Sequence, residues 1–170
     1  MLFRSFENVL TQRRHILKNV QVKAQRGSTT ILPEALRHFT EVLGRLVDLE
    51  LLEATGVEMA VEYSGGIMRE FGRIIARSFE IASLCGDERV LPEHVRDAVR
   101  ELRIELERAT NDAERRKSLA AVRASTKLAT ATDRALLNEN MVVEYVNGHP
   151  WYDVHPLLGE VVDAWLKHTD

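Results

Sequence analysis

The chain has 170 residues, of which 45% are hydrophobic and 29% charged, and its formal net charge is -3. Four prolines and nine glycines are too few for a linker-dominated or disordered chain, so the composition indicates a folded protein. No apolar run approaches the roughly 20 residues that span a bilayer, and the first residues lack a secretory core. We therefore expect a cytoplasmic protein with no membrane partner. The single cysteine, Cys85, excludes an internal disulfide.

The first half of the chain is predicted to be helical, with one short strand. Apolar side chains recur at helical spacing over residues 3–14. Near alternation of apolar and polar residues over 16–24, with two of the apolar residues β-branched, indicates a strand, and a polar loop follows it. Further helices are expected over residues 33–47 and 49–63. Gly65 and Gly66 end the second of these by allowing positive φ, and Ser64 is the candidate cap of the next helix.

Helical patterns continue through the middle of the chain. The helix that follows Gly66 is expected to stop at Gly86 and Asp87. Pro92 fits the first turn of another helix, whose apolar positions continue to Ala109. Asn111 and Asp112 mark a break, after which helical spacing resumes. A further helix is predicted over residues 129–138.

The last forty residues change character. Strand-like runs over 141–146 and 151–154 flank Asn147 and Gly148, and both of these residues tolerate the positive φ of a type I′ turn. The pattern predicts a β-hairpin, in which Pro150 shortens or bulges the second strand. Pro156 opens a closing amphipathic helix.

Two groups of segments together resemble a known family. The first group comprises the helix ending in Ser64-Gly65-Gly66, the helix opening with Met68-Arg69-Glu70, and the helix beginning Leu91-Pro92-Glu93-His94-Val95. These segments are similar to the helical lid of AAA+ ATPases, of the origin-recognition type or the related STAND-type switch ATPases. The resemblance implies that Arg69 is a sensor-2 arginine, which reaches from the lid to nucleotide phosphates, and that Gly65 and Gly66 set its position.

The second group lies near the C-terminal end. It comprises Leu136-Leu137-Asn138-Glu139-Asn140, the Asn147-Gly148 turn and Trp151-Tyr152-Asp153-Val154-His155-Pro156. These segments resemble the last helix and wing of a winged-helix domain, which bacterial P-loop ATPases often carry after the lid. We therefore expect a mainly α protein with an AAA+-like lid over residues 1–110, including a short N-terminal strand remnant. A winged-helix-like module with a C-terminal hairpin and helix is expected over residues 111–170.

The chain lacks the motif Gly-x-x-x-x-Gly-Lys-Ser/Thr, whose backbone N–H groups and lysine hold phosphates in P-loop enzymes. The resemblance thus implies a non-catalytic, C-terminal portion of a P-loop ATPase that mediates nucleotide-dependent domain or subunit contacts. No cofactor is expected for this chain alone, and ATP with Mg²⁺ only together with a P-loop core. The expected partners are that core or other subunits, with self-association left open. A strand remnant without sheet neighbours would expose an edge, which favours self-association or rearrangement of the N-terminus.

A second hypothesis is a DNA-binding winged-helix protein in which the first hundred residues serve dimerisation. In this hypothesis DNA phosphates would contact a set of basic residues that we call the basic set. Acidic residues interleave with it, a pattern that is also typical of a solvated helix face. The basic set comprises Arg115, Arg116, Lys117, Arg123, Lys127 and Arg134.

A purely helical oligomerisation module is a third hypothesis.

Other residues capable of chemistry lack the partners that a site requires. Asp153 lies two residues before His155, but no nucleophile or third metal ligand accompanies them. Cys85 and His94 form a nominal nucleophile and base, yet nothing in the sequence indicates an activated thiol. We expect neither a catalytic residue nor a metal site. The aromatic residues of the hairpin are expected to pack against the closing helix.

Overall fold

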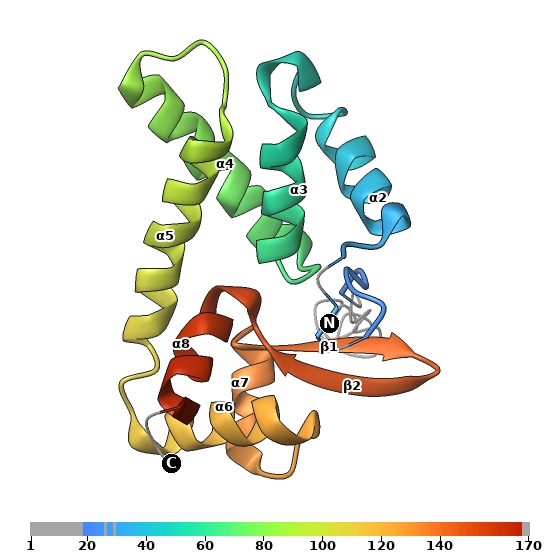
Figure 1. Cartoon of the computed structure of the whole chain (residues 1–170), viewed down its shortest axis with the longest axis vertical. Helices are drawn as coiled ribbons and strands as arrows, with labels where there is room; N and C mark the ends of the chain where they lie inside the picture. The colour runs from blue at the N-terminus through green and yellow to red at the C-terminus, as the bar shows by residue number, and fades with distance from the viewer. Residues whose placement is uncertain (1–18, 26, 29, 168–170) are drawn as a thin grey trace, which may run out of the picture.

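The computed structural model describes residues 19–25, 27, 28 and 30–167. Over these residues the chain is mainly helical, with a two-stranded antiparallel sheet near its C-terminal end (Figure 1). The helix expected over residues 3–14 lies outside the described residues. In chain order the elements are α2 (Pro33–Leu43), the 3₁₀ helix η1 (Leu49–Leu51), α3 (Ala54–Tyr63), α4 (Met68–Cys85), α5 (Pro92–Arg108), α6 (Ala113–Ser125), α7 (Ala131–Asn138), β1 (Val142–Asn147), β2 (His149–Val154) and α8 (Pro156–Lys167).

Helices α2 to α5 pack around an apolar cluster that we call the first core. Each helix contributes a fully buried side chain, because apolar residues spaced three or four apart fall on one helix face. These side chains are Phe39, Val61, Ile74 and Val95. Helices α4 and α5 run antiparallel, and Gly86 between them has a φ of +80° that ends α4 as predicted (Figure 1).

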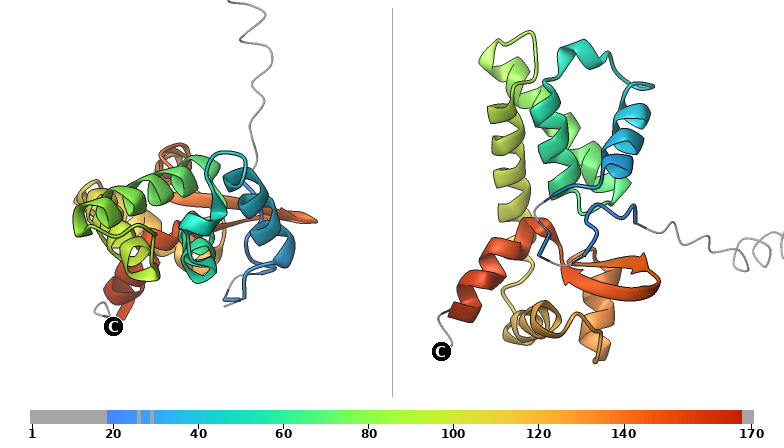
Figure 2. Two further views of the ribbon diagram at one scale, coloured as in Figure 1. Left: turned by 90° about the horizontal axis from the view of Figure 1, so that it is seen from above. Right: turned by 45° about the vertical axis from the view of Figure 1, so that its right-hand side comes forward.

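Helices α6 and α7, the hairpin and α8 surround a second core at the far end of α5 (Figure 2). Leu119, Leu136 and Leu158 are completely buried there. Helix α8 also sends Leu157 into the first core, so it contacts both clusters. The expected division between residues 1–110 and 111–170 stays a prediction.

The predicted hairpin is present, but its turn differs from the expected type. Asn147 lies opposite His149 and Val146 opposite Pro150, so the register is symmetric about Gly148, whose φ is +76°. A two-residue type I′ turn would instead centre the register between Asn147 and Gly148. Pro150 pairs within β2 without interrupting the register. A strand tolerates proline in this position because each strand of a two-stranded sheet has a free edge.

The strand expected over residues 16–24 is absent from the part that the structure describes, which starts at Asn19. The Val20 N–H donates to the Gly66 carbonyl at 2.9 Å, and the Leu32 N–H donates to the Val22 carbonyl at 2.8 Å. These groups belong to a loop and to the start of α2, so no neighbouring strand offers a ladder. Val22 is 1% exposed and fixes this irregular segment to the first core.

Two of the predicted helices are shorter than expected. Helix α2 ends at Leu43 instead of continuing to Val47, and the turn that follows leaves Leu46 76% exposed. The helix expected over residues 49–63 is divided into η1 and α3, because Leu52 forms a parallel bridge with Val90. The helix starts predicted at Pro92 and Pro156 are confirmed.

Candidate functional site

Ser64, Gly65 and Gly66 build the loop between α3 and α4. The Ser64 hydroxyl donates to the Val61 carbonyl at 2.7 Å and accepts from the Gly66 N–H at 3.1 Å. Ser64 thus closes the turn and does not cap α4 as predicted, since the N-cap is Ile67. The predicted positive φ of both glycines is confirmed, at +61° and +81°. A Cβ on Gly66 would lie 1.9 Å from the Val20 carbonyl oxygen, so this position requires glycine.

The same loop is attached to the hairpin and to α8. The Tyr145 hydroxyl donates to the Gly65 carbonyl at 2.9 Å, and a Cβ on Gly65 would lie 2.9 Å from Cδ of Pro156. Burial, together with the charge of Asp153, raises the pKa of Tyr145, so its hydroxyl stays protonated and remains a donor. The loop before α4 therefore links the helices of the first core to the C-terminal hairpin.

Arg69 lies in the first turn of α4, directly after this loop. Its side chain is 70% exposed, and among the described residues its ion pair is the one between Nε and Glu70, at 3.3 Å. A guanidinium with this exposure retains donors for a planar anion such as a phosphate.

Two other arginines continue the face of α4 that starts with Arg69. Arg73 pairs with Glu105 at 2.9 Å, and Arg77 pairs with Glu101. Both glutamates lie on α5, one turn apart, and match the one-turn spacing of the arginines. Counting one more turn along the sequence reaches Ala109, the C-cap residue of α5, which offers no carboxylate. The ladder of ion pairs between α4 and α5 thus ends one step before Arg69.

Glu70 and His155 lie buried near the start of α4. The Glu70 side chain is 8% exposed and accepts hydrogen bonds from Arg69 and Arg73. His155 Nδ1 accepts from the Leu157 N–H at 3.2 Å, and burial lowers the pKa of His155 to about 4, against the opposing charge of Glu70. The imidazole is therefore neutral at neutral pH.

The basic set is dispersed over several environments. Arg115 donates to both carboxylate oxygens of Glu139, at 2.6 and 3.1 Å. Arg116 donates to the Thr110 carbonyl at 3.0 Å, and its guanidinium carbon lies 5.1 Å from the ring centroid of Trp165. The structure does not gather the set into one unengaged patch. Its remaining members with exposed side chains are Lys117, Lys127 and Arg134.

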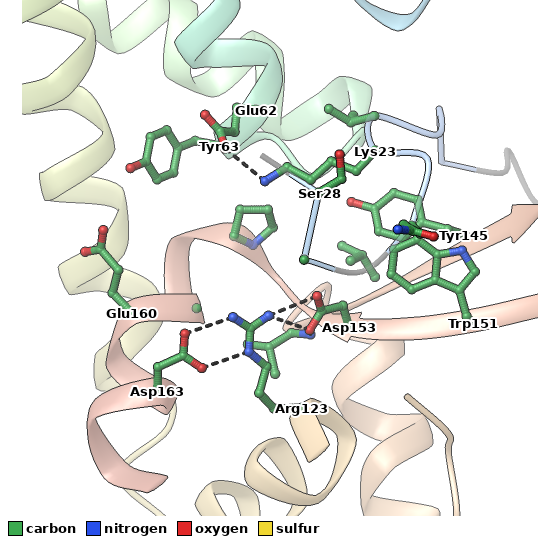
Figure 3. Close-up of a pocket in the computed structure, with 17 residues that line it drawn as sticks. Lys23, Ser28, Glu62, Tyr63, Arg123, Tyr145, Trp151, Asp153, Glu160 and Asp163 are labelled. Carbon is green, nitrogen blue, oxygen red and sulfur yellow. Dashed lines mark hydrogen bonds and ion pairs between the residues drawn. The ribbon is translucent and has the colours of Figure 1, made fainter. Parts of the chain in front are cut away.

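Arg123, which the sequence placed in the same set, joins three elements of the second core. It donates to both oxygens of Asp153 on β2, at 2.8 and 2.9 Å, and to both oxygens of Asp163 on α8, at 2.9 Å (Figure 3). Its side chain is 23% exposed. Such bidentate contacts on both sides hold α6, β2 and α8 together and occupy the guanidinium donors. Asp153 is thereby directed to Arg123 and not to His155.

Three side chains that can bind metals meet at the loop between α4 and α5. The ligand atoms of Cys85, Asp87 and His94 all lie within 4.8 Å of one another. His94 Nδ1 accepts from the Leu91 N–H at 3.1 Å, and Nε2 lies 3.0 Å from Asp87. A neutral ring that accepts at Nδ1 carries its proton on Nε2, the nitrogen nearest Asp87. Metal-bound histidines instead donate from their second nitrogen, so this arrangement favours a structural cap of α5 over a metal site.

No protein-family model, curated protein or solved structure matches this chain. Within the described residues, no helix is long and apolar enough to cross a membrane. The sequence did not predict the Tyr145 contact with Gly65 or the pairing of Arg73 and Arg77 with α5. The four-residue spacing of Glu101 and Glu105, which matches that of Arg73 and Arg77, could have predicted the ion pairs between α4 and α5. Inference about function therefore rests on the residues around Arg69.

Proposed function

We propose that this chain is the helical lid and winged-helix portion of a P-loop ATPase, and that it transmits a nucleotide-dependent contact without itself catalysing hydrolysis. The resemblance of Ser64-Gly65-Gly66 and Arg69 to a sensor-2 segment motivates the proposal. In this function Arg69 binds phosphate oxygens of a nucleotide held by a P-loop core. That core also supplies the Mg²⁺ and the phosphate-binding loop.

The observation that carries the proposal is the unequal pairing along α4. Arg73 and Arg77 each have a glutamate partner on α5, whereas among the described residues the ion pair of Arg69 is with its own neighbour, Glu70, and leaves the guanidinium 70% exposed. The exposed guanidinium at the start of a helix favours an external anion, because its planar donors match a phosphate.

The loop before Arg69 supplies a route for transmission. Gly65 accepts a hydrogen bond from Tyr145 and contacts Pro156, so any movement of the first turn of α4 strains contacts with β1 and α8. Gly66 is held in the same way by Val20. Closure of the lid on a nucleotide would therefore change the position of the C-terminal hairpin relative to its partners.

Site-specific photo-crosslinking tests this function. Met68, which is exposed beside Arg69, is replaced by p-benzoylphenylalanine in cells that make the protein, lysates receive either a non-hydrolysable ATP analogue or ADP, and cross-linked peptides are identified by mass spectrometry. We expect peptides from a protein that contains a P-loop, with a higher yield in the presence of the ATP analogue than of ADP. The same reporter at Arg96, an exposed position on α5, is the control. Cross-links at position 68 that involve no nucleotide-binding protein, or that ignore the nucleotide, would refute the proposal.

The succession of α6, α7 and a hairpin motivates the DNA-binding alternative, in which α7 would enter a groove. Internal pairing of Arg115, Arg116 and Arg123 counts against it. Fluorescence anisotropy with a labelled duplex at low salt distinguishes the two functions. Binding that falls steeply with added salt, and that Lys117→Gln with Lys127→Gln weakens, would support the DNA-binding alternative. Because neither lysine has a packing role in the second core, these substitutions leave the fold intact.

A further inference from the structure

A groove lies where α3, the hairpin and α8 meet the irregular segment that begins at Asn19. It encloses about 280 Å³ and is lined in part by Val22 and Lys23 of that segment, and by Trp151 of β2 (Figure 3). None of the residues named for Arg69 and its ion-pair ladder lines it. The groove is thus separate from the candidate phosphate contact.

The groove carries an excess of negative charge. Four carboxylates line it, from Glu62, Asp153, Glu160 and Asp163, against the two cations Lys23 and Arg123. Arg123 is shared between two aspartates, Lys23 pairs with Glu62 at 2.9 Å, and Glu160 pairs with Arg103 of α5 at 2.5 Å, so one negative charge stays in excess. A cationic occupant would therefore be attracted to this surface.

An aromatic wall accompanies these charges. The rings of Tyr145 and Trp151 lie 4.6 Å apart and form one side of the groove (Figure 3). Tyr145 is buried, whereas Trp151 is only half-buried. A matching occupant combines apolar side chains with basic ones.

The first 18 residues of the chain have this composition. They contain four basic residues, Arg4, Arg13, Arg14 and Lys18, against the single acid Glu7, so their net charge is +3 while the rest of the chain carries -6. Phe3, Phe6, Val9 and Leu10 recur at helical spacing. Residues 1–18 therefore carry net positive charge, and the rest of the chain carries net negative charge.

The point of attachment is also suitable. Residue 18 is four positions before Val22, which itself lines the groove. An extended chain spans about 3.3 Å per residue, so Arg14 can reach points within roughly 17 Å of Asn19, where the described segment begins. Tethering at this distance gives an effective concentration on the order of millimolar, which favours an intramolecular contact even when its intrinsic affinity is weak.

We propose that the groove is the docking site for residues 1–18 of the same chain, with basic side chains against its carboxylates and apolar side chains against Trp151. Docking of residues 1–18 in the groove does not require that the chain be part of an ATPase, so this proposal is independent of the proposed function.

Paramagnetic relaxation enhancement in the full chain tests this docking. In a Cys85→Ser background, Gln12→Cys carries a nitroxide label, and the indole N–H signals of the two tryptophans are the reporters. The signals are assigned with Trp165→Phe. We expect the Trp151 signal to lose intensity much more than the Trp165 signal, and to recover when the nitroxide is reduced. Replacing Arg13 and Arg14 by glutamate should abolish the loss, whereas the same reversal at the exposed Arg45 and Arg96 should not.

Two results would overturn the proposal. Equal intensities of Trp151 with the oxidised and the reduced label would mean that residues 1–18 do not occupy the groove. A mixture of labelled ¹⁴N chains and unlabelled ¹⁵N chains detects contacts between molecules. If Trp151 loses intensity in that mixture to the same extent, the occupant is the N-terminal segment of a second copy.

Discussion

Replacement of Gly66 by alanine should destabilise the protein substantially. The φ of +81° costs an L-residue about 1–2 kcal/mol, and the new Cβ would lie 1.9 Å from the Val20 carbonyl oxygen. Relief of this clash requires the segment around Val20 to move away. The movement would lose the hydrogen bond from Val20 to Gly66, worth about 1 kcal/mol, and expose part of Val22, worth up to about 2 kcal/mol. We expect a total loss of about 2–5 kcal/mol.

The measurement is urea unfolding followed by far-UV circular dichroism, and Gly72 provides a matched control. Gly72 lies exposed within α4, and a Cβ added there would have nothing within 4 Å. Gly72→Ala should therefore stabilise the protein by about 0.5–1 kcal/mol, because alanine loses less backbone entropy on helix formation. If Gly66→Ala unfolds at the same urea concentration as the wild type, the attachment of the loop to Val20 is not the constraint inferred from the structure.

Three further predictions concern ionisable side chains of the described residues. Arg123→Met should lower the free energy of unfolding by about 2–3 kcal/mol, because it leaves two partly buried aspartates without their partner. The control is Arg37→Met, at an ion pair whose arginine side chain is 71% exposed, and it should cost at most about 0.5 kcal/mol. Equal losses in the two variants would contradict the stabilising role of Arg123. Burial lowers the pKa of His155 from 6.5 to about 4, so between pH 6.5 and pH 4 the imidazole binds a proton in the unfolded state but not in the folded state. The free energy of unfolding should therefore fall by up to about 3 kcal/mol as the pH drops from 6.5 to 4. Unfolding midpoints at several pH values check this, and His155→Asn, whose side-chain oxygen can still accept from Leu157, should lose that pH dependence. Zn²⁺ should leave the melting temperature unchanged, and a rise that Cys85→Ser abolishes would show that the proton on His94 Nε2 is no barrier to a metal.

Most helices were predictable because their signals are local. Pro92 and Pro156 start helices for a reason confined to the first turn, and Gly86 ends α4 through its own φ. The prediction of a strand over residues 16–24 was wrong because alternation of side chains does not provide a neighbouring strand whose backbone could form hydrogen bonds with the segment. Similarly, the division of the helix over residues 49–63 depends on the bridge from Leu52 to Val90, which is remote in sequence.

The candidate site was predictable only in its local part. The positive φ of Gly65 and Gly66 follows from residue type, but the contact of Gly65 with Tyr145 joins residues 80 positions apart. The roles of the basic residues depend on tertiary neighbours in the same way. Arg123 is indistinguishable from Lys127 in a charge pattern, yet the fold places two aspartates around the first and leaves the second exposed.

The ladder between α4 and α5 has a consequence for the choice of helix register. If α4 slid by one turn, about 5.4 Å, the spacing would set Arg69 against Glu105, Arg73 against Glu101 and Arg77 against Asp97, so each arginine would again face an acidic residue of α5. Ion pairing between the two helices therefore does not by itself exclude the slipped arrangement. Exposed ion pairs contribute at most about 1 kcal/mol each, whereas burial of Ile74 and Val95 is worth about 2 kcal/mol or more per side chain. Apolar packing, and not the exposed ion pairs, thus selects the observed register of α4 against α5.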